Sequence, residues 1–113
     1  MITNTKRAYF DALRTLAAGG ISAAYAAVGT PSAFPIRGFC ITNDTQGDLI
    51  FSDDPNVAAG KWFIAQGSYK LWDVQANQNA KKDDAFEMTV GTQFYVKQVT
   101  APTSGDVYIE ILH

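Results

Sequence analysis

The stretch Val-Tyr-Ile-Glu-Ile-Leu at residues 107–112 indicates the fold most directly. Its apolar residues at 107, 109 and 111 alternate with other side chains, and residues 86–90 show the same alternation. A period of two sends every second side chain to one face of an extended chain, whereas a helix repeats about every 3.6 residues. Both stretches are therefore predicted to be β-strands with one buried face.

Short apolar runs bounded by glycine, proline, asparagine and aspartate fill the middle of the chain. They predict further strands near residues 21–28, 36–42, 49–52, 62–65, 69–74 and 94–99. The polar run from Asn43 to Asp48 provides turn residues for a hairpin between two of them. Because no helical pattern separates these runs, the sheets are predicted to be antiparallel. The chain is therefore expected to be mostly β, an antiparallel β-sandwich of jelly-roll-like form.

The inner faces of these strands are predicted to supply the core. Aromatic and branched side chains fill the space between two packed sheets with few residues. The side chains expected to be mostly buried are Phe39, Ile41, Ile50, Phe86, Met88, Phe94, Val96, Val107, Ile109 and Ile111.

Residues 4–18 differ from the rest and predict an N-terminal α-helix. Alanine and leucine, which favour helices, recur there near helical spacing, and Gly19-Gly20 follows as a stop. The expected organisation is a helix or anchor at residues 1–20 and a β-sandwich domain at residues 21–113. A helix this short is marginal in water, so it is expected to dock. It either closes one end of the sandwich or binds another protein through an apolar stripe of Tyr9, Phe10, Leu13 and Leu16.

Composition limits the classes of partner. The 113 residues fit one domain, with a formal net charge of −2 and a pI near 5.1. Nucleic acid is not an expected partner, because binding its phosphates requires clustered Lys and Arg. No continuous apolar stretch is long enough for a membrane span or a signal peptide, so no membrane association is expected. Cys40 is the single cysteine, which excludes an internal disulfide.

Residues that could serve as a general base, a nucleophile or a set of metal ligands are scarce, and the protein is predicted not to be an enzyme. His113 is the only histidine and stands at the end of the sequence, where chains are usually mobile. A triad, a Cys40–His113 pair or a zinc site would depend on that position. No metal and no cofactor are expected. Asp53, Asp54 and Asn56, with Asp83-Asp84, provide a calcium alternative, but acidic residues in turns usually only form the turn.

Trp62 and Trp72 allow two interpretations. The favoured one is that both rings are partly buried core, which is usual for tryptophan in a small sandwich. The other is an aromatic platform for a sugar ring, which would make the chain a carbohydrate-binding module.

Six short segments of the sequence remain to be considered together: Val-Gly-Thr-Pro (28–31), Phe-Cys-Ile-Thr-Asn-Asp-Thr (39–45), Leu-Ile-Phe-Ser-Asp (49–53), Gly-Ser-Tyr-Lys-Leu-Trp-Asp (67–73), Gly-Thr-Gln-Phe-Tyr-Val-Lys (91–97) and Gly-Asp-Val-Tyr-Ile-Glu-Ile-Leu (105–112). In this order they resemble segments of small virion structural proteins of short-tailed bacteriophages. The resemblance implies a non-enzymatic, homo-oligomeric component of the tail or head–tail junction, either a short fibre or an adaptor-bound protein. A capsid decoration protein is the alternative. Implied partners are other virion proteins (adaptor, nozzle or capsid), with assembly in the bacterial host cytoplasm and final location in the virion.

Overall fold

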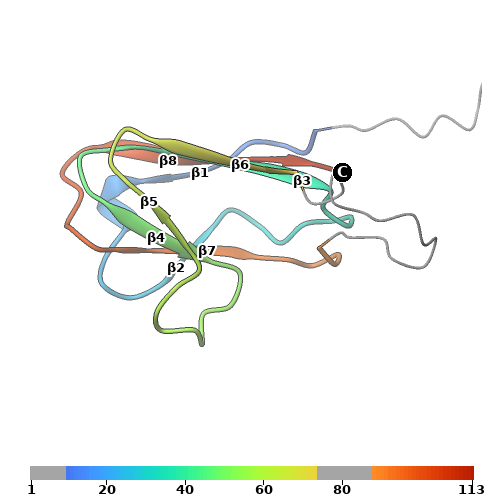
Figure 1. Ribbon diagram of the computed structural model, residues 1–113, viewed down its shortest axis with the longest axis horizontal. Coiled ribbons are helices and arrows are strands. Elements are labelled where there is room, and N and C mark those ends of the chain that lie inside the picture. The colour runs from blue at the N-terminus through green and yellow to red at the C-terminus, as the bar shows by residue number, and fades with distance from the viewer. Residues whose placement is uncertain (1–9, 74–87) are drawn as a thin grey trace, which may run out of the picture.

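Two sheets packed face to face make up the part of the chain that the computed structural model describes, residues 10–73 and 88–113 (Figure 1). Within these described residues, eight strands and a single 3₁₀ turn, η1 (Ala18–Gly20), are present. The strands are β1 (Arg14–Ala17), β2 (Ala26–Val28), β3 (Gly38–Thr45), β4 (Leu49–Ser52), β5 (Trp62–Ile64), β6 (Tyr69–Asp73), β7 (Phe94–Gln98) and β8 (Gly105–Leu112).

The strand pairing follows one rule along the chain. The first strand pairs with the last, the second with the seventh, the third with the sixth and the fourth with the fifth, all antiparallel. Further pairings of β3 with β8 and of β4 with β7 complete the sheets β1-β8-β3-β6 and β2-β7-β4-β5. This is the pattern of one long antiparallel ribbon rolled over on itself, and it defines a jelly roll. The predicted antiparallel sandwich is confirmed.

The core lies between the two sheets. Seven of the side chains expected there are buried: Phe39, Ile41, Phe94, Val96, Val107, Ile109 and Ile111. Ile50 is only half-buried, because the register of β4 turns Leu49 and Phe51 inward instead. Met88 packs partly buried against the core, and Phe86 lies outside the described residues.

The N-terminal helix predicted for residues 4–18 is wrong over its described part. Phe10 forms an isolated bridge with Leu112, and β1 pairs with β8 along its whole length. Helix propensity differs between residues by only fractions of a kcal/mol, so the hydrogen bonds offered by the adjacent strand override it. Residues 14–17, expected in a separate anchor, therefore belong to the sandwich. Residues 4–9 lie outside the described part.

Two other local predictions also differ from the structure. Residues 88–90 form no strand, and Met88 makes only a single bridge to Ile36. The turn after β3 is not a hairpin, because β3 and β4 belong to different sheets. It is a corner between the layers, held by the fully buried Asn43 amide, whose Nδ2 donates to the carbonyls of Gly47 (2.8 Å) and Ile64 (3.0 Å).

Candidate functional site

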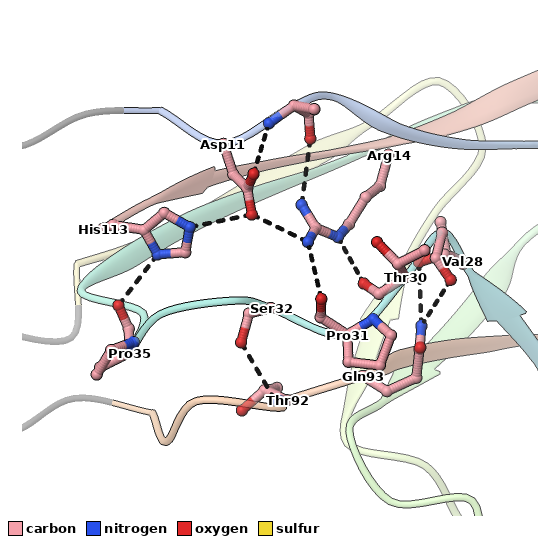
Figure 2. Close-up of polar contacts among 12 residues, drawn as sticks. Asp11, Arg14, Val28, Thr30, Pro31, Ser32, Pro35, Thr92, Gln93 and His113 are labelled. Atoms are coloured by element: carbon pink, nitrogen blue, oxygen red, sulfur yellow. Dashed lines mark hydrogen bonds and ion pairs between the residues drawn. The ribbon is translucent and has the colours of Figure 1, made fainter.

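A buried arginine organises one margin of the sandwich (Figure 2). The Arg14 side chain is only 7% exposed, and its Nε donates to the carbonyl of Thr30 at 2.8 Å. Its Nη1 donates to the carbonyl of Ala12 at 3.1 Å, and Nη2 donates to Asp11 Oδ2 at 3.0 Å and to the carbonyl of Pro31 at 3.3 Å. The guanidinium thus fastens β1 to the connection between β2 and β3.

His113, the residue directly after β8, also takes part in this arrangement. Its Nε2 lies 3.0 Å from Asp11 Oδ2 and its Nδ1 lies 3.1 Å from the carbonyl oxygen of Pro35. Hydrogen bonding from His113 lowers the pKa of Asp11 to about 2, with help from the Ala12 N–H and from Arg14. We call Asp11, Arg14 and His113 the Arg14 network. The expectation that His113 is mobile is wrong, because its side chain is buried.

The two tryptophans lie in the aromatic part of the core. The Phe39 ring stacks on Trp72 with a centroid distance of 4.8 Å and meets Trp62 edge-on at 5.4 Å. The two indoles are 5.6 Å apart and tilted by 55°. Both are half-buried and pack against the core cluster. This geometry favours the core interpretation over two coplanar rings presented to a sugar.

The outward side of the β1-β8-β3-β6 sheet has a different character. We call this side the outer face. In the strand register, Cys40 of β3 lies opposite Leu71 of β6 and opposite Glu110 of β8, so these three side chains are neighbours on the outer face. Leu71 is 70% exposed. Around them lies a hollow of about 420 Å³ that Phe10 and Leu112 also line. Contiguous exposed apolar side chains of this kind are a feature of interaction sites.

In the described strands, the charged side chains on the outer face are all acidic. Asp44, Asp73, Asp106 and Glu110 occupy outward positions of its strands, and no Lys or Arg does so in the described strands. The pKa of the Tyr108 phenol is raised, chiefly by the charge of Asp106. Burial raises the pKa of the Cys40 thiol, and the Glu110 carboxylate adds to this effect. The outer face therefore combines apolar contact area with negative potential.

The residues predicted as a docking stripe do not share one surface. Phe10 is 73% exposed at the rim of the hollow and Leu13 is also exposed, whereas Leu16 packs against the core. Tyr9 lies outside the described residues. Sequence reasoning missed Leu71, Cys40 and Glu110, although period two in residues 69–73 and 107–112 already separates the two faces of these strands.

Asp53 and Asp54, the acidic residues considered as calcium ligands, instead make contacts with nearby residues of the chain. Asp53 pairs with Lys61 at 2.8 Å, and Asp54 Oδ1 accepts the backbone N–H of Asn56 at 2.9 Å. Within residues 10–73 and 88–113 there is no group of three potential metal ligands, and Asp83-Asp84 lie outside this range. The part of the chain that the structure describes also contains no helix with the length and hydropathy needed to span a bilayer.

Neither the known family models nor the curated proteins include a match to this chain. Among solved structures, a chain described as "Cyanophage Pam1 capsid asymmetric unit" is similar to it, with a TM-score of 0.46 and 13% sequence identity. The similarity covers 99% of this chain and 87% of that chain.

Proposed function

We propose that the protein is a multi-copy structural component of a tailed-bacteriophage virion, located at the tail or the head–tail junction as a short fibre or adaptor-bound protein. The sequence phrases described above support this origin. The jelly roll is compatible with it, because this architecture recurs in viral capsid domains as well as in lectins and cupins. Fold alone does not decide function, so the proposal depends on the surface of the sandwich.

The outer face is the observation on which the proposal rests most. Leu71 and Phe10 are among the large apolar side chains that the described residues expose, and both line one hollow. The fold does not need them there, because the core between the sheets is complete without them. An assembling subunit needs such a surface, since burying apolar area stabilises association by about 25 cal/mol per Å² before other costs.

The proposal includes no catalytic activity and no cofactor. In the described residues the best-placed titratable groups, Asp11 and His113, are engaged with Arg14 and with the Pro35 carbonyl, contacts that fasten the fold. The proposed partners of the protein are other virion proteins and further copies of the same chain. Assembly takes place in the cytoplasm of the bacterial host.

Localisation in purified particles tests this proposal. Virions of a phage that encodes the chain should contain it in many copies, measured by quantitative mass spectrometry against the major capsid protein. Gold-labelled antibody should mark the tail or neck in electron micrographs. Label spread over the capsid surface would identify a decoration protein instead. Absence of the chain from washed particles would contradict a virion role.

A further inference from the structure

A row of polar and aromatic side chains crosses the outer face beyond the hollow, toward the start of β6. The register places Tyr69 of β6 opposite Thr42 of β3, which lies opposite Tyr108 of β8. Tyr108 in turn lies opposite Thr15 of β1. We call these four residues the tyrosine row. The Cα atoms of its two tyrosines are about 10 Å apart, since neighbouring strands are spaced by about 4.8 Å.

The backbone fixes both tyrosines while their rings stay accessible. Tyr69 is 67% exposed, and the residue before it is tied to β3, because the Asn43 N–H donates to the Ser68 carbonyl at 2.8 Å. Tyr108 lies in β8, between β1 and β3. Its hydroxyl donates to Asp106 Oδ2 at 3.4 Å, so the half-buried ring leans along the strand. The sheet therefore holds two aromatic rings in place before any ligand arrives, which lowers the ordering cost of binding.

Two carboxylates border the tyrosine row. Asp44 lies directly opposite Asp106, at the outward positions next to Thr42 and Tyr108. Neither carboxylate forms an ion pair with a described residue. Like charges directly opposite one another on neighbouring strands destabilise a sheet, so the stability of the fold does not explain this pair. Carboxylates accept strong, charge-assisted hydrogen bonds, which makes them suitable partners for a ligand rich in hydroxyl groups.

This combination of groups fits a sugar better than the surface of another protein. The cores of protein–protein interfaces are depleted in charged residues, whereas Asp44 and Asp106 lie beside the tyrosine rings. A pyranose ring has an apolar C–H face that packs on an aromatic ring, and hydroxyls at its edge that donate to carboxylates. Small-molecule sites combine aromatic side chains with a few polar groups in the same way. Sugars that carry a carboxylate would be repelled by the two aspartates.

We propose that the tyrosine row binds a neutral oligosaccharide, with sugar rings packed on Tyr69 and Tyr108. Hydroxyls of the sugar donate to Asp44 and Asp106, and the Thr42 hydroxyl between the two rings adds a further polar contact. The two tryptophans take no part, since both pack against the core. This inference goes beyond the virion role, and the tyrosine row shares no residue with the lining of the hollow.

A nuclear magnetic resonance titration of the full chain tests the site. The probes are neutral oligosaccharides of glucose, galactose, mannose and N-acetylglucosamine, with oligogalacturonate as the acidic counterpart. At least one neutral probe should shift the backbone amide signals of Thr42, Tyr69 and Tyr108 saturably, with a Kd below about 1 mM. Oligogalacturonate should bind more weakly. Failure of the whole neutral panel, shifts confined to other residues, or tighter binding of oligogalacturonate would overturn the proposal.

Variants test the contribution of the rings. Tyr69→Ala and Tyr108→Ala should each raise the Kd by about tenfold or more, because each removes an aromatic face, whereas Tyr69→Phe keeps the ring and should retain most of the affinity. Phe63→Ala is the matched control, since Phe63 is 44% exposed on the outward side of the other sheet. Circular dichroism checks folding, and Tyr108→Leu replaces Tyr108→Ala if the latter misfolds. An unchanged Kd in Tyr69→Ala, or an equal loss in Phe63→Ala, would refute the site. The particle analysis above decides the virion role separately.

Discussion

The two faces of the β1-β8-β3-β6 sheet come from the same strands and yet differ in almost every property. Alternate residues of β3 and β8 place Phe39, Ile41 and Ile109 against the second sheet, where at most 3% of each is exposed. Their neighbours on the outer face include Leu71, at 70% exposure, and a group of carboxylates. The apolar side chains of the inner face form the core and so stabilise the fold. Those of the outer face lie outside the core cluster and are therefore available for binding.

The largest loss of folding stability is expected from removing the Phe39 ring from the inner face. Its ring contacts Trp72, Trp62 and Phe94 at centroid distances of 4.8, 5.4 and 5.0 Å. Phe39→Ala removes these contacts and leaves a cavity, so we expect a loss of about 3–5 kcal/mol in the free energy of unfolding. Urea denaturation monitored by tryptophan fluorescence measures it. A loss below about 1 kcal/mol would contradict the view that this ring is central to the core.

A somewhat smaller loss is expected at Asn43, a fully buried polar residue of the inner face. Asn43 Nδ2 donates to two carbonyls, and its Oδ1 accepts from the Thr45 N–H at 3.1 Å and the Thr45 hydroxyl at 2.6 Å. Asn43→Ala removes these four hydrogen bonds inside the protein, and we expect a cost of about 2–3 kcal/mol in the free energy of unfolding. Asp44→Ala, one position along on the outer face, is the control and should change stability by less than about 0.5 kcal/mol. Equal losses would show that the corner does not depend on the amide.

The Arg14 network predicts a pH dependence at the margin of the sheet. The pKa of Asp11 is lowered from 3.8 to about 2 in the folded protein, so its contribution is complete above pH of about 4 and is lost as pH falls towards 2. Since the carboxylate is 23% exposed, we expect only about 1–2 kcal/mol. Asp11→Asn should remove this part of the acid sensitivity, measured as urea midpoints at pH 6, 4 and 2.5. An unchanged acid profile would contradict the network.

The smallest effect on folding is expected on the outer face. Leu71 is 70% exposed on the edge strand β6, so Leu71→Ala should change the free energy of unfolding by less than about 0.5 kcal/mol. Comparison with Phe39→Ala under the same conditions sharpens the contrast between the faces. Should Leu71→Ala destabilise the protein by more than about 1.5 kcal/mol, the side chain would belong to the core and the outer face would lose its claim to be a binding surface.

The sequence by itself determined the class of fold and most of the core. Alternation within residues 107–112 is a local property of the chain, and it predicted correctly that Val107, Ile109 and Ile111 face inward. The antiparallel arrangement followed from the absence of crossover helices between the expected strands. These features depend on a few neighbouring residues, so a single sequence is enough to show them.

Only the tertiary structure decided the rest, because the deciding partners are distant in sequence. Residues 14–17 are a strand, since β8 offers backbone hydrogen bonds that outweigh a weak helical preference. Arg14 is buried because the carbonyls of Thr30 and Pro31 and the Asp11 carboxylate satisfy it, and His113 is held across more than a hundred residues by that same carboxylate. Which side of a strand stays open depends on where the second sheet packs, and no local pattern contains that information.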